Sequence, residues 1–202
     1  KDDIAEKIED NGLDSDYVKV RVLGQFPSAG SVQFIGMEEV NKAMFRPVMP
    51  DRSMPLIIGV DVARFGDDQS VIYPRIGNDA RSFGFKAFRS LNGVQLAGKI
   101  IQMVQEFQSL GITHYNIFID DTGGYGGSPI DHLEFLGWHA VGVNFGMASV
   151  DGTYRYRGDE MWGNMREAIR STLGIPADDL LKDQLTQREY GYTLTGNKIH
   201  LE

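Results

Sequence analysis

The segment Leu56-Ile57-Ile58-Gly59-Val60-Asp61 is an apolar run of strand length that ends on a carboxylate. A polar turn over 64–69 separates it from a second predicted strand, Ser70 to Ile76, and Gly77-Asn78 is typical of a hairpin. A third strand is predicted over Arg81 to Arg89. Because short turns join consecutive strands in antiparallel order, we expect these three strands to form an antiparallel meander.

Two further strands alternate with helices after the meander. Val94 to Leu110 carries apolar residues at the helical period and is followed by Gly111, so it is predicted to be a helix. Tyr115 to Asp120 is a second buried strand that ends on an acid. A helix from about Ser128 to Leu136 and a strand over His139 to Val143 follow. This order predicts an α/β fold, a mixed sheet of meander plus parallel strands with helices on both faces.

The flanking segments add shorter elements. The expected elements are a helix or linker over 1–16, a half-buried strand over 17–24, helices over 37–44, 158–173 and 179–187, and a hairpin over 190–201. On the helix over 158–173, Trp162 with Met161 and Met165 is expected to belong to the core.

Composition limits the class of protein. The chain has 202 residues, of which 42% are hydrophobic, which suits one globular domain with a sizeable core. No apolar run approaches the ~20 residues of a membrane span, and the charged first ten residues carry no signal-peptide core. The absence of cysteine excludes disulfides, zinc–thiolate sites and thiol catalysis, and suits a reducing cytoplasm.

The net charge of -8 argues against a nucleic-acid partner, because neutralising phosphates normally needs a basic surface. A protein that concentrates carboxylates to hold divalent cations is a partial exception, since the bound ions attract phosphate.

Two apolar strands each end on aspartate, at Asp61 and Asp120. If the strands are neighbours, both carboxylates lie at the carboxyl edge of the sheet and can share a cation. Oxygen ligands without a His or Cys cluster favour Mg²⁺ or Mn²⁺, and two ions ~4 Å apart can activate a water and stabilise the departing 3′-oxygen of a phosphodiester. Asp68 is a candidate for a further ligand, whereas Asp121 should point away and serve a turn or cap. The alternative is that these aspartates only form turns.

Other candidate residues are less specific. The run Gly123 to Gly127 permits a close approach of the backbone to a phosphate, or simply a tight strand-to-helix turn. No Walker A loop occurs. Arg155, Arg157 and Arg166 are candidates for contacts with a DNA backbone, although a solvated helix face explains Arg166 equally well. The four histidines lack ligand spacing and are expected to be structural or superficial.

Four motifs in order resemble phage large terminases. Val22 to Pro27 resembles their segment between motor and nuclease, and Gly59 to Ser70 resembles their first nuclease motif. Asp120 to Gly127, with Asp131-His132-Leu133, resembles the second, and Arg157 to Glu167 resembles the helix that follows. The resemblance covers nearly the whole chain.

The resemblance implies an RNase H-like endonuclease that uses two Mg²⁺ or Mn²⁺ ions to cut double-stranded viral DNA during headful packaging. In that reading Asp61 bridges the metals and Asp120 holds one of them. Residues 1–30 would be a leading segment from an ATPase domain, and 31–202 the nuclease domain. A further catalytic aspartate is expected soon after Glu202. Partners would be DNA, a portal protein and a small terminase subunit in the host cytoplasm, with no membrane.

Three other functions remain open. An ATP-binding domain of the actin and sugar-kinase type shares the expected strand order, although the residues after Asp61 lack its phosphate-wrapping Gly and Ser/Thr. The acidic balance favours a module that docks on a portal or on DNA without cutting. A Holliday-junction resolvase has a related fold.

Overall fold

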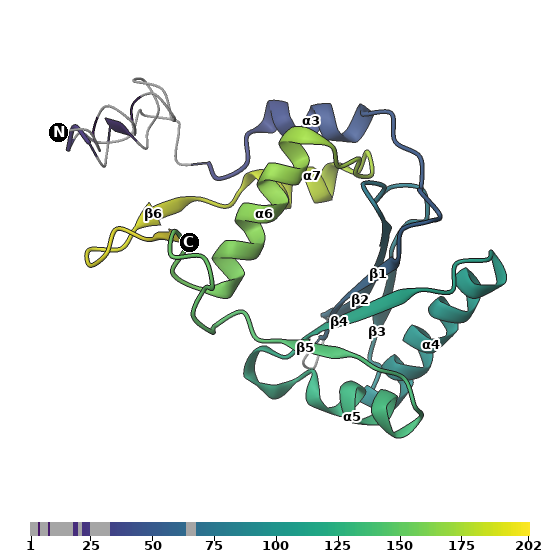
Figure 1. Cartoon of the computed structure of the whole chain (residues 1–202). Coiled ribbons are helices and arrows are strands. Elements are labelled where there is room, and N and C mark those ends of the chain that lie inside the picture. Colours follow the sequence, from purple (N-terminus) through teal and green to yellow (C-terminus); the bar gives the residue numbers. More distant parts are fainter. Residues whose placement is uncertain (1–3, 5–7, 9–17, 20–21, 25–32, 64–67) are drawn as a thin grey trace.

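The computed structural model describes residues 4, 8, 18–19, 22–24, 33–63 and 68–202. Its centre is a five-stranded sheet with the strand order β3-β2-β1-β4-β5 (Figure 1). The strands are β1 (Leu56–Asp61), β2 (Gln69–Ile76), β3 (Lys86–Arg89), β4 (Tyr115–Asp120) and β5 (Val141–Val143). The first three pair antiparallel, while β4 joins β1 and β5 joins β4 in parallel. The predicted meander and mixed sheet are therefore confirmed.

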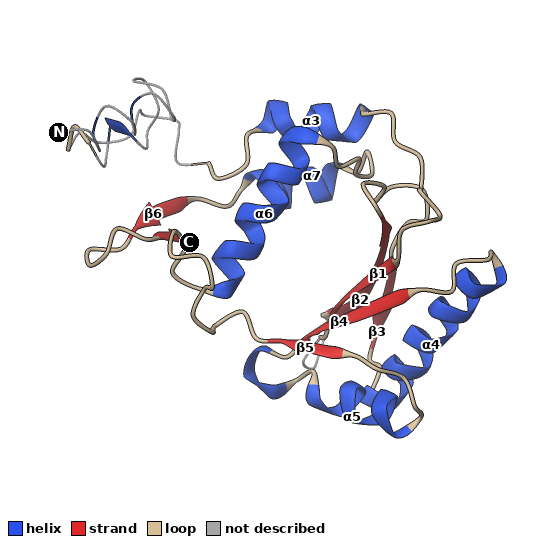
Figure 2. Cartoon of the chain, viewed as in Figure 1, coloured by secondary structure: helices blue, strands red, loops and turns tan. Residues whose placement is uncertain are grey.

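Helices α4 (Gly93–Ser109) and α5 (Gly127–Phe135) cover one face of the sheet (Figure 2). Alternate residues of β1 and β4 point into this layer. Tyr115 is partly buried there, and the others are at most 5% exposed: Leu56, Ile58, Val60, Ile117 and Ile119. They pack against the buried stripe of α4. Since strand side chains alternate, Ile57, Gly59 and Asp61 lie on the opposite face.

Local signals delimit α4 on both sides. The Asn92 side chain accepts a hydrogen bond from the Gln95 N–H at 2.9 Å, and the Gln95 side chain accepts one from the Asn92 N–H at 3.0 Å. This reciprocal cap satisfies two N–H groups that the helix itself leaves unpaired. Gly111, with φ 87°, follows the helix in the left-handed conformation that glycine adopts without strain.

A second layer lies on the opposite side of the sheet from α4 and α5 (Figure 2). This layer contains α3 (Met37–Phe45), α6 (Arg157–Ser171), α7 (Asp179–Thr186) and a hairpin of β6 (Tyr190–Tyr192) and β7 (Ile199–Leu201). It has its own apolar cluster, which includes Phe34, Ile169 and Leu185. Helices therefore lie on both sides of the sheet, as predicted.

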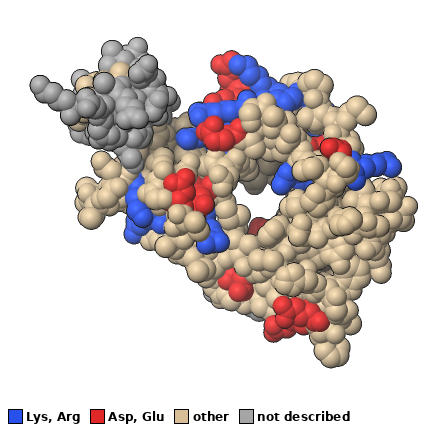
Figure 3. Space-filling model, in the orientation of Figure 1, with Lys and Arg blue, Asp and Glu red and all other residues tan. Residues whose placement is uncertain are grey.

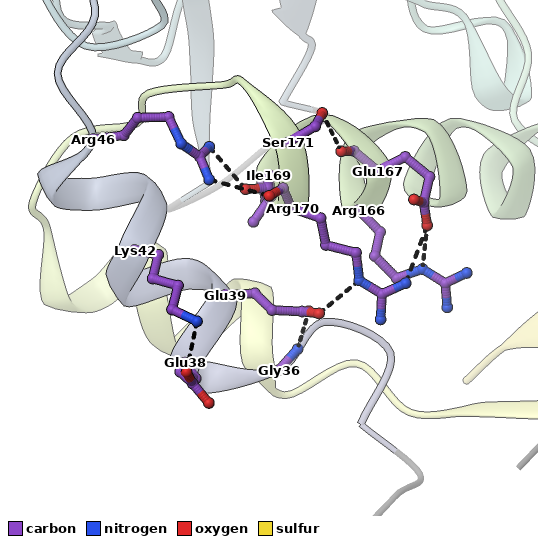
Figure 4. A network of polar contacts seen from close by, with 10 residues as sticks. All are labelled: Gly36, Glu38, Glu39, Lys42, Arg46, Arg166, Glu167, Ile169, Arg170 and Ser171. Carbon is purple, nitrogen blue, oxygen red and sulfur yellow. Dashed lines mark hydrogen bonds and ion pairs between the residues drawn. The ribbon is translucent and has the colours of Figure 1, made fainter. Parts of the chain in front are cut away.

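Polar contacts join α3 to α6 (Figure 4). Just after α3, the Arg46 guanidinium donates to the carbonyls of Ile169 at 2.9 Å and Leu173 at 2.6 Å, at the end of α6. Within α3, Glu39 accepts from the Arg170 Nε at 2.6 Å. A cation at the carboxyl end of a helix also opposes the helix dipole, so Arg46 stabilises this junction in two ways.

Three predicted strands differ from the structure. Within the segment over 17–24, Val18 and Lys19 are helical, and the Val22 N–H donates to the Val18 carbonyl as in a helical turn. The third strand begins at Lys86, not at residue 81, because the Asp79 carboxylate binds the Ser82 N–H and turns the chain away from β2. The last parallel strand is limited to residues 141–143.

The predicted helices agree with the structure to within one or two residues at each end. Most of the predicted leading segment, residues 1–30, lies outside the described residues. Among the helices that the structure describes, none is both long and apolar enough to cross a membrane.

Candidate metal centre

Asp61 and Asp120 end two adjacent parallel strands. In the register of these strands, Val60 pairs with Ile119, so the two aspartates follow side by side at the carboxyl edge of the sheet. Both project from the face opposite α4, because the residues before them point into the α4 layer. The predicted neighbourhood of the two acids is therefore present.

The two aspartates line one pocket of about 300 Å³ together with Asp68. The remaining lining residues are Val62, Ala63, Gln69, Thr122 and Tyr125. Asp68 enters this pocket from the start of β2, the antiparallel neighbour of β1. Three aspartates from three places in the sequence thus line one pocket. Asp67 lies outside the described residues.

The clustering is visible in the electrostatics of Asp61. Neighbouring protein atoms displace water from its carboxyl group and raise its pKa above the ordinary value of 3.8, and the charges of Asp120 and Asp68 raise it further. A hydrogen bond from the Val62 N–H opposes this shift. Asp61 keeps a large exposed surface, so water still screens part of the repulsion. A cation between these carboxylates would relieve the remaining repulsion.

Hydrogen bonds hold the chain where it leaves each acidic strand. The hydroxyl of Ser70, which is 2% exposed, accepts from the Ala63 N–H at 3.0 Å and ties the exit of β1 to β2. Asp120 Oδ1 accepts from the Thr122 N–H at 2.8 Å. No hydrogen bond to Asp120 Oδ2 is found within the described part of the chain, so this oxygen can serve a cation.

The residues present match the chemistry of a hard divalent cation. All three acids supply carboxylate oxygens, which Mg²⁺ and Mn²⁺ prefer. Among the described residues, however, no three His, Cys, Asp or Glu side chains stand in an arrangement that would already enclose an ion.

The glycines after Asp120 are explained by backbone packing. Gly123 and Gly124 have φ values of 76° and 81° within a short 3₁₀ helix, Thr122–Gly124. A Cβ at Gly126 would lie 2.6 Å from the carbonyl oxygen of Asp120. Of the two interpretations left open by the sequence, the tight strand-to-helix turn is the one these contacts support.

Asp121 lies in the turn after β4, as expected: it directly precedes the 3₁₀ helix, and its carbonyl accepts a hydrogen bond from the Gly124 N–H at 3.1 Å. Its side chain makes no cap hydrogen bond, and its Oδ1 is buried without a partner in the described structure. The carboxylate lies beside Gly142 of β5, so it does point away from the pocket as predicted. The side-chain hydrogen bond of this turn is made by Asp120.

The three candidate arginines do not form one patch. Arg155 lies over the ring of Tyr156, with its guanidinium carbon 4.6 Å from the ring centroid, and Arg157 begins α6. Arg166 follows nine residues later, about 2.5 helical turns, so it lies on the opposite side of α6 from Arg157. It packs over Phe34 at 4.3 Å, and its side chain is only 19% exposed. Arg166 thus lies apart from Arg157, and its contact with DNA stays a prediction.

Sequence reasoning missed Ser70, Thr122 and Tyr125 as parts of the site. Ser70 begins a predicted strand, and nothing in its neighbours indicates that its hydroxyl reaches back to Ala63. Thr122 lies two residues after Asp120, which ends a strand. An aspartate at the start of a turn often accepts a hydrogen bond from the backbone N–H two residues later. That pattern would have identified Thr122.

Together, the mixed sheet and the acids at its carboxyl edge define an RNase H-like fold. No family model and no curated protein matches the sequence. Among solved structures, the nuclease domain of the large terminase subunit gp2 of bacterial virus Sf6 is similar, with a TM-score of 0.61 and 14% identity over 84% of this chain and 87% of that chain. The large terminase nuclease from thermophilic phage G20c has a TM-score of 0.59 and 12% identity, over 82% and 87%. The chain thus has the fold of phage large terminase nuclease domains.

Several structures of these two proteins contain divalent cations. The K428A mutant of the Sf6 nuclease domain is known with manganese and beta-thujaplicinol, and the K428A mutant gp2c of the Sf6 large terminase subunit is known with calcium. The G20c nuclease is known with magnesium and with cobalt. Divalent cations therefore bind to domains of this fold.

Proposed function

We propose that this chain is a metal-dependent endonuclease that cleaves double-stranded viral DNA during genome packaging. The observation that carries the proposal is the convergence of Asp61, Asp68 and Asp120 on one pocket at the carboxyl edge of the sheet. The shared fold with phage large terminase nuclease domains supports it, as do the cations bound to those domains.

The geometry suggests a role for each acid. Asp61 lies between the other two along the strand order β2-β1-β4, so it is suited to contact two Mg²⁺ or Mn²⁺ ions at once. Asp120 would offer its Oδ2, because Oδ1 is held by Thr122, and Asp68 would complete the set from β2. When bound, the ions would supply an activated water and stabilise the leaving oxygen of the phosphodiester.

The charge of the protein is compatible with this role once the pocket holds cations. The net charge of -8 would repel DNA, but three of the negative charges are concentrated where divalent ions would neutralise them. We propose that Arg155 and Arg157 contact the DNA backbone outside the pocket. Arg155 precedes α6 and Arg157 is its first residue, so the two lie close together in the chain.

The division of the chain follows from the same proposal. We propose that residues 31–202 form the nuclease domain and that residues 1–30 lead from an ATPase domain. A portal protein and a small terminase subunit would be the partners, in the host cytoplasm.

Nicking of supercoiled plasmid in Mn²⁺, by a protein that also carries the further catalytic aspartate expected after Glu202, tests the activity. Asp61→Ala and Asp120→Ala are expected to reduce the cleavage rate by more than ~10- to 100-fold. That is the loss typical when a residue that only hydrogen-bonds to a metal ligand is replaced. Asp131→Ala is the matched control, because this exposed aspartate on α5 carries the same charge on the other side of the sheet. Calorimetric titration with Mn²⁺ should show binding to the parent and to Asp131→Ala only.

Two results would contradict the assignment. If Asp61→Ala or Asp120→Ala cuts as fast as the parent, these carboxylates do not hold the catalytic ions. If the chain hydrolyses ATP in Mg²⁺ and leaves plasmid intact, the ATP-binding alternative is correct.

A further inference from the structure

A cavity of about 500 Å³ lies between α6 and the face of the sheet that α4 and α5 do not cover. Its sheet side is formed by Ile57 and Gly59 of β1 and by Tyr73 and Arg75 of β2. The residues on the other side are Phe145, Gly158, Met161, Trp162 and Met165. Figure 3 shows an opening between these two parts of the molecule. The volume is in the range of pockets that enclose a small ligand.

The lining combines flat aromatic surfaces with flexible apolar ones. Tyr73, Phe145 and Trp162 contribute rings, and two methionines contribute side chains that adapt to their contacts. A side chain at Gly59 would meet no atom within 4 Å, so the centre of the sheet side is open. Trp162 and Met165 are partly buried and pack against the apolar cluster of the second layer, as predicted, and they also line this cavity; Met161 is 42% exposed.

This cavity adjoins the acidic pocket. Gly59 and Asp61 lie on the same face of β1, about 6.6 Å apart along the strand. On the other side, the Phe145 N–H donates to the Thr122 hydroxyl at 3.0 Å, which joins a residue of the cavity to a residue of the pocket. A polynucleotide with one of its phosphates at Asp61 could thus place a group next to that phosphate in the cavity.

We propose that the cavity binds a nucleobase that has left the duplex stack, next to the phosphate that is cut. This inference rests on the proposed nuclease function and specifies its substrate: DNA that is frayed, flapped or distorted at the cleavage point. A base is flat and can stack on rings such as Trp162 or Phe145, whatever its identity. Paired bases are stacked on their neighbours and cannot enter, so unstacking would precede cutting.

The arrangement favours a base over another apolar occupant. The cavity opens beside a site suited to a phosphodiester, so one polynucleotide can occupy both. Arg75 places a cation among the lining residues, where it can contact a phosphate or the polar edge of a base. The Arg75 guanidinium donates to the Gly77 carbonyl, and a purely apolar peptide or lipid chain would offer its charge no anionic or polar group.

Trp162 fluorescence provides a readout that does not depend on cleavage. The chain has two tryptophans, so the Trp138→Phe protein reports on Trp162 alone. We would titrate this full chain, in Ca²⁺ and again in EDTA, with a single-stranded oligothymidine and with a blunt duplex of equal length. The single strand is expected to change the emission of Trp162 and to bind at least about 5-fold more tightly than the duplex. This ratio is the lower limit of the affinity gained when one base stacks on an aromatic ring.

Filling the cavity separates this site from general attraction to DNA. Gly59→Val adds a side chain to the open centre, and a β-branched residue suits a strand. It is expected to weaken single-strand binding about 5- to 100-fold while duplex binding changes less. Gly98→Val, at an exposed glycine of α4 with equal free space, should leave both unchanged.

The outcomes distinguish this inference from the proposed function. If the protein nicks plasmid but Gly59→Val binds single strands as the parent does, the base site is refuted and the nuclease stands. If Trp162 responds to single strands but the protein that also carries the aspartate expected after Glu202 shows no Mn²⁺-dependent cutting, the nuclease is refuted and the base site stands. An apolar dye that binds the cavity and is not displaced by oligothymidine would also overturn the base site.

Discussion

Replacing Asp61 by Asn should stabilise the metal-free protein while removing its response to metal. Asn has nearly the same shape but no charge, so it removes the repulsion from Asp68 and Asp120. Because Asp61 is exposed and screened by water, we expect a gain of only about 0.5 to 1 kcal/mol. For a chain of this length that corresponds to a rise in Tm of about 1 to 4 °C.

The sign of the pH dependence follows from the raised pKa of Asp61. The folded protein binds this proton more tightly than the unfolded chain, whose carboxyl titrates near the ordinary value of 3.8. Stability from the protonated group is therefore fully present below that value and is lost as pH rises through the raised pKa of the folded state. Asp61→Asn should accordingly exceed the parent in Tm at neutral pH and match it in strong acid.

Metal reverses the order of the two proteins. Mn²⁺ at about 100 times its Kd would stabilise the parent by about 2.7 kcal/mol, a rise of roughly 5 to 11 °C in Tm. Asp61→Asn should lose most of this rise. The assay is thermal unfolding in EDTA and in Mn²⁺, with Asp131→Asn as the control of equal charge. A lower Tm of Asp61→Asn in EDTA, or a full Mn²⁺ response, would refute the reasoning.

Two further substitutions test the framework around the site. Ser70→Ala removes the buried acceptor of the Ala63 N–H and should cost about 1 to 3 kcal/mol of the free energy of unfolding, measured with urea. A cost within error of zero would show that this hydrogen bond does not hold the end of β1. Arg46→Ala leaves carbonyls at the end of α6 without their charged donor and should cost about 1.5 to 3 kcal/mol in the same measurement. An unchanged unfolding midpoint would show that water replaces the guanidinium.

Strands β1 and β4 were predicted to the residue, whereas the segment over 17–24 was not. Both strands are apolar runs bounded by turns, and their pattern is contained within six residues each. The alternation over 17–24 is equally local, but Val18 is fully buried and helical in the structure. A short alternating pattern is compatible with either form, and packing decides between them.

The outer strand β3 shows the same limit in another way. Its aromatic residues favour a strand from residue 81, yet the chain joins the sheet only at Lys86. The Asp79 carboxylate accepts hydrogen bonds from Arg81 and Ser82, which holds the backbone in a turn before that point. Such a side-chain contact competes with sheet pairing and is not visible in hydrophobic periodicity.

By itself, the sequence determined that Asp61 and Asp120 end buried strands and that oxygen ligands would dominate the site. Only the tertiary structure decided that β1 and β4 are neighbours, that Asp68 returns to the same pocket, and that α6 stands off the sheet to leave a cavity. The physical reason is range: alternation and turn preference act between residues close in the chain. Strand pairing, repulsion between carboxylates and the spacing of layers exist only once distant segments have been brought together.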